Sequence, residues 1–353
     1  DVVAVVPQEI KLTRIPIFQF AMYSSGKMEI SCGQPFKITG KVHANDMLYV
    51  EPSSDLTFQS DVSAVGSILF ARDPLDTRGA VGGTVVYQQR KDAHVGAMSL
   101  PIGTNNTPEA IREIIQPPPS GEDPTSTLGR MRYYNQTDMI LTVSDSGVTA
   151  TSGYFNGFTT PIPSSELSAI VTTNNSFQDA REGKTVRPID LNIGALAAWS
   201  LTNTSMRDAL GSKDLSSVYV VDRRTLAGTQ LGAVRLVNGQ QLPARGLTVV
   251  TARPLYVFGH YNQTNNAKLA TTDTTTTLPA SIVADAVTIL SPNWVDTNSA
   301  ALLKFRNAKP TTVNAAILTG VVETTLGKYS GGMENFPRFL ESWGSANAFS
   351  YNG

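Results

Sequence analysis

Four aspartates in the alternating parts of the chain are the residues that could support acid–base chemistry: Asp46, Asp55, Asp61 and Asp285. Glycoside hydrolysis needs two or three carboxyl groups that converge on one face, at a separation set by the mechanism. Asp46 aligns with Gly66 in the repeat described below, and Asp55 follows a Pro-Ser-Ser run, so both occupy turn positions. The pattern favours turn-forming aspartates over a catalytic pair, and we expect no enzymatic activity.

The histidines and the cysteine are isolated from one another in the sequence. A zinc site needs several ligands at defined spacing, and His43, His94 and His260 do not provide it. His43 falls on a polar position that Ser63 occupies in the next repeat, so we expect solvated surface histidines. The single cysteine, Cys32, has no basic partner nearby in sequence, which predicts a buried or half-buried structural thiol. We therefore expect no metal and no cofactor.

Two further chemical motifs are incomplete. Ser144 or Ser146 with Asp145 could form part of a Ser-His-Asp triad, but SDSG predicts a hairpin turn and lacks the Gly-x-Ser-x-Gly elbow. The glycines of 79–83 lack the lysine and the following helix of a phosphate-binding loop. Oxygen-rich loops such as 261–266 contain few carboxylates, so they would bind calcium only weakly.

A repeat of twenty residues supplies the elements that must position these side chains. When 35–50 is aligned with 55–70, the apolar positions coincide and alternate with polar ones. The superimposed pairs are Phe36 with Leu56, Ile38 with Phe58, Val42 with Val62, Ala44 with Ala64, Leu48 with Ile68, and Val50 with Phe70. The preceding segment continues the register with Phe18, Met22, Met28 and Ile30. Alternation predicts half-buried strands, and a fixed period near twenty predicts one set of strands per solenoid coil.

The repeat and the loss of it divide the chain into three regions. We expect an N-terminal strand with solenoid coils over 1–70, an insertion over 71–245, and returning coils over 246–353. The fold class is all-β: a right-handed parallel β-helix with a large loop-rich insertion and a few short helices. At 353 residues such a solenoid can be a single unit.

The insertion contains a few recognisable elements. Pro108 suits the first position of a helix, and 110–115 supplies its apolar face. The strings at 139–143 and 148–152 flank SDSG and predict a β-hairpin. A second short helix is expected within 189–201.

The third region returns to short alternating strands. The segments 255–259, 282–286 and 313–317 align position by position, which predicts that they stack upon one another as successive coils. The segment 333–343 is amphipathic at helical spacing, and we expect a helix that covers the open end of the solenoid.

Composition limits the partners and the location. The net charge is −1, and lysines and arginines are scattered, whereas nucleic-acid binding needs a basic stripe. Charged residues make up 16% of the chain, against about 25% in typical soluble domains. Thr, Ser, Asn and Gln replace them, as is typical of secreted bacterial β-proteins. No apolar stretch reaches the length of a membrane span, so we expect none in this chain.

Residues 2–6 and 10–23 are apolar and β-prone, which favours assembly. A strand of this kind either packs on its own solenoid or adds to the sheet edge of a neighbour. The candidate assembly residues are Val3, Val5, Ile10, Leu12, Ile15, Ile17, Phe18 and Phe20.

Several strings in the chain resemble those of exported bacterial β-helix proteins of the PilX-like, type IV pilus-associated group. They are EIKLTRIPIFQFAMY (9–23), ITGKVHAND (38–46), PIGTNN (101–106), PSGEDP (119–124), YYNQTDMILTVSDSGVT (133–149), YVFGHYN (256–262), VNAAILTG (313–320) and ENFPRFLESW (334–343). The resemblance implies a β-helical body and a place outside the bacterial cell or at its surface. No activity is assigned to that group, so the resemblance implies a fold and a location but not an activity.

These observations predict a structural subunit of an extracellular or cell-surface filament or pilus-like appendage. The subunit would assemble with copies of itself through strand and solenoid-end contacts. Two alternatives stay open: a β-helix protein that binds or cleaves carbohydrate, and a pilus-associated adhesin that does not polymerise. Surface glycans are the other expected partner, and nucleic acid is not expected.

Overall fold

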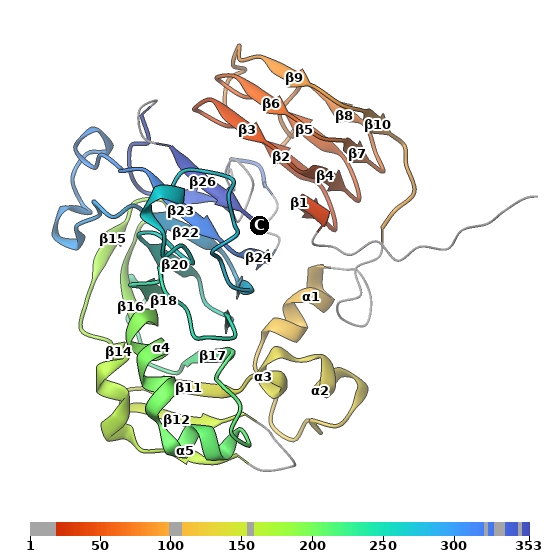
Figure 1. The fold of residues 1–353 in the computed structure, drawn as a ribbon. Coiled ribbons are helices and arrows are strands. Elements are labelled where there is room, and N and C mark those ends of the chain that lie inside the picture. Colours follow the sequence, from red (N-terminus) through yellow and green to blue (C-terminus); the bar gives the residue numbers. More distant parts are fainter. Residues whose placement is uncertain (1–18, 99–107, 154–158, 321–323, 328–335, 345–347) are drawn as a thin grey trace, which may run out of the picture.

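The computed structural model describes residues 19–98, 108–153, 159–320, 324–327, 336–344 and 348–353. This part of the chain is mostly β, built from short strands that pair largely in parallel. Figure 1 shows two bodies of strands, one in red and orange and the other running from yellow-green to blue. None of the helices in the described ranges is long and apolar enough to cross a bilayer.

Three short parallel sheets make up the first body. Their strand orders are β1-β4-β7-β10, β2-β5-β8 and β3-β6-β9. The strands are β1 (Phe20–Ser24), β2 (Met28–Ile30), β3 (Phe36–Ile38), β4 (Lys41–Ala44), β5 (Leu48–Val50), β6 (Leu56–Phe58), β7 (Val62–Ala64), β8 (Ile68–Leu69), β9 (Val85–Tyr87) and β10 (Lys91–Ala93). Consecutive strands therefore belong to different sheets, and every third strand returns to the same sheet.

The predicted twenty-residue register is confirmed in these ladders. Leu56 lies opposite Phe36, and Val62 lies opposite Val42. The weaker register of the preceding segment is confirmed too, since Met28 lies opposite Leu48. The inward side chains form one apolar core, because alternation points every second residue of a strand inward.

One predicted pair is wrong, and the pairing continues past it. Strand β8 ends at Leu69, so Phe70 has no place opposite Val50 and is 58% exposed. After a longer connection over 70–83 the ladders resume, with Val85 opposite Leu56 in β9.

Two larger sheets and one short pair form the second body. Their orders are β13-β12-β11-β17-β19-β21-β24, then β14-β16-β18-β20-β22-β25 with β15 beside β16, and β23-β26. The strands are β11 (Met139–Ser144), β12 (Gly147–Ser152), β13 (Pro161–Ile162), β14 (Val171–Thr172), β15 (Phe177–Asp179), β16 (Lys184–Asn192), β17 (Ser217–Asp222), β18 (Gln230–Val237), β19 (Leu247–Thr251), β20 (Leu255–Phe258), β21 (Ala280–Ala284), β22 (Val287–Leu290), β23 (Thr311–Asn314), β24 (Ala316–Thr319), β25 (Arg338–Phe339) and β26 (Phe349–Asn352). Position 245 is the expected end of the insertion. The pairings β17–β19 and β18–β20 join strands before this position to strands after it within the same sheets.

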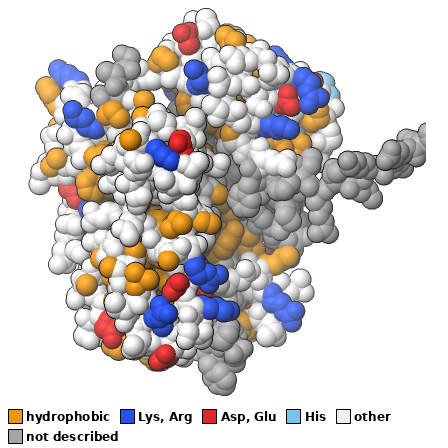
Figure 2. Space-filling model, viewed as in Figure 1, with side chains coloured by type: hydrophobic (Ala, Val, Ile, Leu, Met, Phe, Trp, Pro, Cys, Tyr) orange, Lys and Arg blue, Asp and Glu red, His pale blue; other side chains and the backbone are white. Residues whose placement is uncertain are grey.

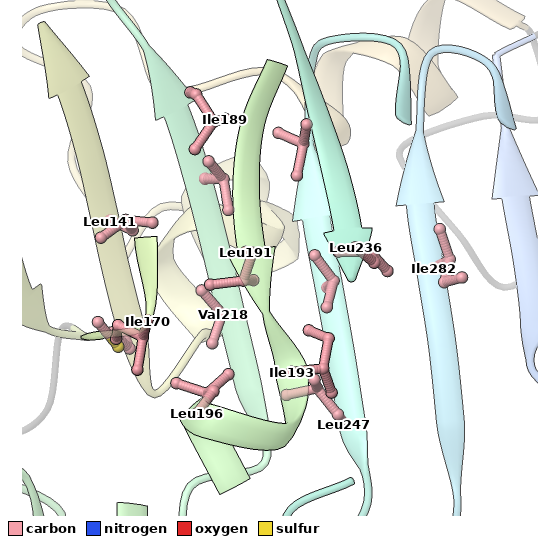
Figure 3. Close-up of a cluster of buried hydrophobic side chains, with 14 of the residues drawn as sticks. Leu141, Ile170, Ile189, Leu191, Ile193, Leu196, Val218, Leu236, Leu247 and Ile282 are labelled. Carbon is pink, nitrogen blue, oxygen red and sulfur yellow. The ribbon is translucent and has the colours of Figure 1, made fainter. Parts of the chain in front are cut away.

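The main core lies between these two sheets. Figure 3 shows Leu191 and Leu236 of one sheet directed toward Val218 and Leu247 of the other. A helix closes this core at one side, because Leu196 of α4 (Ile193–Thr202) is fully buried in the same cluster.

The helices and the hairpin agree with the predictions from the sequence in most respects. Helix α1 (Pro108–Ile115) is confirmed, and its apolar face packs on the outer side of the sheet that holds Tyr219. The hairpin β11–β12 is confirmed, with Ser144 opposite Gly147 at its turn. The second predicted helix begins only at Ile193, because β16 occupies the residues before it. The remaining helices are α2 (Thr127–Met131), α3 (Tyr133–Gln136), α5 (Thr204–Ala209) and the 3-10 turns η2 (Ser164–Ala169), η3 (Asn266–Lys268), η4 (Asp296–Asn298) and η5 (Leu303–Phe305).

The predicted stack of the third region is wrong. Leu255 lies opposite Val287, whereas Ile282 lies opposite Val249 and Ile317 in the other sheet. Strand β23 belongs to neither of these sheets and pairs with β26. The same short apolar alternation recurs in every sheet, so similarity of pattern does not identify the sheet to which a strand belongs.

The predicted C-terminal helix is wrong over its described part, 336–343. That part holds β25, where Phe339 lies opposite Ile289 of β22. Pro337 has no N–H and disfavours helix at the residue before it, while parallel pairing satisfies the backbone that follows. Residues 333–335 lie outside the described ranges.

Candidate functional site

Of the candidate assembly residues, only Phe20 lies within the described part of the chain. Phe20 lies in β1 and pairs within the chain, opposite Lys41 of β4. Its ring is 5.9 Å from that of His43 and 6.1 Å from that of Tyr23, so it contributes to intrachain packing. The other candidates lie outside the described residues: Val3, Val5, Ile10, Leu12, Ile15, Ile17 and Phe18.

The prediction of a solvated His43 is wrong, because its side chain is fully buried. Nδ1 lies 2.8 Å from the Ser63 hydroxyl, and Nε2 lies 2.9 Å from Oδ1 of Asn45. The imidazole stacks on Tyr23, and Asn45 donates to the carbonyl of Met98, so the chain beyond β10 returns across this face. Burial lowers the pKa of His43.

The other two histidines lie elsewhere and form no common site. His94 is exposed and adopts a left-handed conformation with φ of 59°. His260 is half-buried, and its Nδ1 accepts from the backbone N–H of Thr312 at 3.1 Å. No group of three or more metal-ligating side chains occurs in the described ranges.

Asp46 and Asp55, the two aspartates predicted at turns, lie between strands of the first body, and Asp61 lies there too. Asp46 Oδ1 accepts from the N–H of Met47 at 2.8 Å, and Asp61 pairs with Arg90 at 2.9 Å. Asp55 accepts from the Thr84 hydroxyl, which lies next to the start of β9. The structure does not bring them together with Asp285, which lies between β21 and β22.

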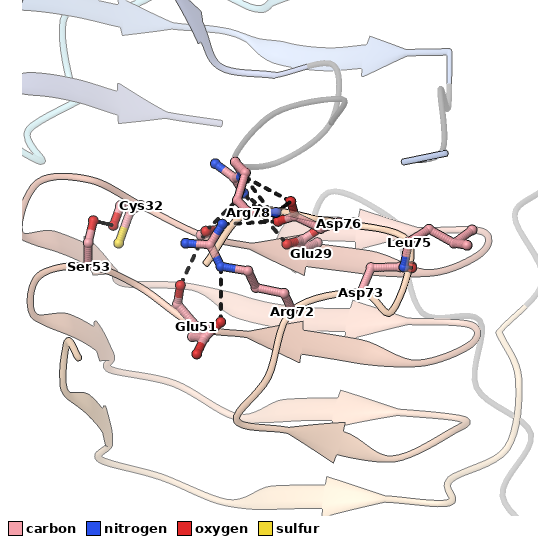
Figure 4. Close-up of polar contacts among 10 residues, drawn as sticks. Glu29, Cys32, Glu51, Ser53, Arg72, Asp73, Leu75, Asp76 and Arg78 are labelled. Atoms are coloured by element: carbon pink, nitrogen blue, oxygen red, sulfur yellow. Dashed lines mark hydrogen bonds and ion pairs between the residues drawn. The ribbon is translucent and has the colours of Figure 1, made fainter. Parts of the chain in front are cut away.

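The structure instead assembles an acidic cluster that the sequence did not reveal. Loop 70–83 crosses the outer face of the sheet β2-β5-β8 and encloses ionisable side chains there (Figure 4). The members of this cluster are Lys27, Glu29, Glu51, Arg72, Asp73, Asp76 and Arg78. Lys27 pairs with Asp73 at 2.9 Å, and Arg72 pairs with Glu51 at 3.0 Å.

Asp76 forms the centre of the acidic cluster. Arg78 holds its carboxylate through Nη2 at 2.7 Å and Nε at 3.0 Å, and Arg72 Nη1 lies 3.1 Å away. Burial opposes ionisation, but the hydrogen bonds from Arg78 hold the pKa of Asp76 well below its usual range. Asp76 therefore stays ionised within the loop.

Glu29 is the unusual member of the acidic cluster. It is 2% exposed, and neither carboxylate oxygen has a hydrogen-bond partner among the described residues. The nearest cation, Arg78, is 3.9 Å from Oε1 and already engaged with Asp76. Burial, followed by the negative charge of Asp76, raises the pKa of Glu29 to about 7.

A carboxyl group that titrates near neutrality is suited to general acid–base catalysis, but Glu29 is too buried to meet a substrate. One sequence signal points toward the cluster: Glu29 sits between Met28 and Ile30 in a strand, and loop 70–83 carries two arginines and two aspartates.

Cys32, beside this cluster, behaves as predicted. It is half-buried against the core of the first body, and burial raises the pKa of its thiol to about 11. A thiol with so high a pKa is a poor nucleophile at neutral pH.

The strands β8, β9 and β10 end their sheets and form a second candidate feature, the terminal edge. Three large apolar side chains lie exposed there: Leu69 at 39%, Phe70 at 58% and Val86 at 48%. An edge strand leaves half of its N–H and C=O groups unpaired, and charged side chains normally protect it. Exposed Lys91 and Asp92 do so on β10, whereas β8 and β9 contain no charged residue.

Charges elsewhere on the surface are mixed. Figure 2 shows basic and acidic side chains interspersed over the visible face.

Comparison of the chain with protein-family models, with curated proteins and with solved structures found no match.

Proposed function

We propose that the chain is a structural subunit that assembles with copies of itself into a cell-surface filament, without catalysis. In this proposal the first body is a right-handed parallel β-helix of three faces, and each set of three strands is one coil. The twenty-residue spacing of its ladders supports that reading, as does the right-handed preference of parallel crossover connections.

The terminal edge is the observation that carries the proposal. Burying a large apolar side chain fully contributes about 1.5–3 kcal/mol, so partial burial of Leu69, Phe70 and Val86 adds a few kcal/mol. Backbone pairing along β8 and β9 would fix the orientation of the added strand. Edges like this one are ordinarily protected, and an unprotected edge is a template for another chain.

The apolar segment of residues 2–18 in a second copy is the proposed occupant. It alternates like a strand, and it precedes β1, which is the first strand of the same body. A contact between different surfaces of two copies is heterologous, and it propagates into a filament when it does not close a ring. Location at the bacterial cell surface rests on the polar, charge-poor composition and on the family resemblance.

Negative-stain electron microscopy with light scattering tests the proposal. The variants are a double substitution, Phe70→Asp with Val86→Lys, and a chain that lacks residues 1–18. The matched control is Leu326→Lys, at a side chain that is 74% exposed and lies in the other body. Filaments from the parent and the control, but not from either variant, would support the proposal. Single particles from the parent at high concentration would refute it.

A further inference from the structure

A polar cleft of about 400 Å³ opens in the second body, apart from the terminal edge. It lies where the turn of the hairpin β11–β12, the strand β16 and the loop between β17 and β18 meet. Its principal polar residues are Ser144, Asp145, Asn174, Arg187, Arg224 and Gln230. A volume of this size is at the lower end of small-ligand sites and accommodates one or two sugar residues.

One side of the cleft is a guanidinium that the fold holds in place. Arg224 is paired with Asp222 through Nε at 2.8 Å and Nη2 at 2.9 Å, and its side chain is 9% exposed. Nη2 also donates to the carbonyl of Arg187 at 2.7 Å. Gly232 makes room for the pair, because a Cβ there would lie 2.3 Å from Oδ2 of Asp222. The cation is thus fixed before any ligand arrives.

The second guanidinium, that of Arg187, is available for a ligand. Arg187 extends from β16, is half-buried, and forms no side-chain hydrogen bond or ion pair with the described residues. A fork of N–H donors that has no protein acceptor fits a carboxylate bidentately.

The rest of the lining fits hydroxyl groups. Ser144, Asn174 and Gln230 offer hydroxyl and amide groups. The Thr225 hydroxyl and N–H lower the pKa of Asp145, so Asp145 is an ionised acceptor. An ionised Asp145 disfavours a ligand with several negative charges such as a nucleoside polyphosphate. Leu226 is the apolar member of the lining, and no aromatic ring lines the cleft for stacking.

We propose that this cleft binds a carboxylate-bearing sugar unit of an acidic polysaccharide. Arg187 pairs with the sugar carboxylate, Arg224 supports it from the fixed side, and Asp145 accepts hydrogen bonds from the sugar hydroxyls. The proposal does not depend on filament assembly, since the cleft and the terminal edge lie in different bodies.

Calorimetric titration of the full chain tests the proposal. The probes are oligogalacturonate, oligomannuronate and sialyllactose, with neutral maltohexaose and dextran sulfate as comparisons. The variants are Arg187→Gln and Arg187→Lys, and the matched control is Arg223→Gln, which removes the same charge from an exposed neighbour outside the cleft. Circular dichroism checks that each variant is folded.

We expect at least one acidic sugar to bind and maltohexaose not to bind. Arg187→Gln should weaken binding about ten- to a hundredfold, in line with a charge-assisted pair, and Arg223→Gln less than twofold. Arg187→Lys should retain part of the affinity, because it keeps the charge and loses the fork. Failure of all three acidic sugars to bind would overturn the proposal. So would an equal loss in Arg223→Gln, or tighter binding of dextran sulfate, which would indicate non-specific charge attraction.

Discussion

Replacing Glu29 by glutamine should stabilise the first body at alkaline pH and leave it unchanged in acid. The native pKa of Glu29 is about 7, against an ordinary value of 4.5, so the native state retains a proton that the unfolded chain releases. Stability therefore falls as pH rises through the window from 4.5 to 7, and it levels off on either side. Glutamine stays neutral and resembles the protonated acid in shape, so the variant has no such loss.

The size of the effect follows from the same shift of the Glu29 pKa. A rise from 4.5 to about 7 corresponds to about 3 kcal/mol in the free energy of unfolding. Because Glu29 is 2% exposed and lacks hydrogen bonds, little solvent screening reduces this figure. At pH 8 the variant should exceed the parent by roughly this amount, and at pH 4.5 the two should coincide.

The chain offers a reporter for the first body alone. All three tryptophans (Trp199, Trp294 and Trp343) lie in the second body, so their fluorescence does not follow the first. Cys32 is the single cysteine and packs against the core of the first body. Its labelling by a disulfide reagent along a denaturant series gives the unfolding free energy at each pH. The rate at which a thiol reacts with the reagent also depends on pH. Comparing parent and variant at the same pH removes this effect.

Glu51→Gln is the matched control within the acidic cluster. Glu51 accepts from Arg72 at 3.0 Å, so its loss should destabilise the body at pH 8 and give no alkaline gain. The reasoning about Glu29 fails if parent and Glu29→Gln show parallel stability against pH, or if Glu51→Gln gives the same alkaline gain.

Two further predictions concern packing. Asp190→Asn should destabilise the second body by about 1.5–3 kcal/mol. It removes the carboxylate whose two oxygens hold the buried guanidinium of Arg235 at 2.7 Å, while Asp296 keeps its contact with Nη1 at 2.6 Å. Tryptophan fluorescence during denaturation measures the loss, and a loss under about 1 kcal/mol would contradict the prediction. Gly83→Ala should loosen the attachment of strand β9, because its Cβ would lie 2.4 Å from the carbonyls of Pro52 and Ser54. Faster amide exchange across β9, with β2 unchanged, is the expected result, and unchanged protection of β9 would refute it.

The sequence was informative where the chain repeats without interruption. Apolar alternation with a constant period determines which residues lie opposite each other, so Val42 and Val62 could be paired from sequence. It failed where connections vary in length, as for Leu255 and Ile282, because the period then no longer identifies the sheet. It also failed for His43, since the cover over that residue comes from the segment that ends at Met98.

The sequence could point to single members of the candidate sites but could not bring those members together, for a related reason. The acidic cluster joins Glu29 to a loop more than forty residues later, and the cleft joins Ser144 to Arg187 and Arg224 from separate strands. No spacing rule connects such residues, because their proximity depends on the path of the folded chain. The hairpin turn at 144–147 was predicted correctly, but nothing local indicated that it borders a cleft.

The long connection between β8 and β9 has a practical consequence for engineering. The strand pairing resumes after it, with Val85 opposite Leu56, so the length of this connection does not determine how the core residues align. Added side-chain atoms at Gly79 and Gly82 would meet no neighbour within 4 Å. A foreign peptide spliced between these two positions would therefore be displayed on the surface of the folded protein, at a cost that grows only slowly with its length.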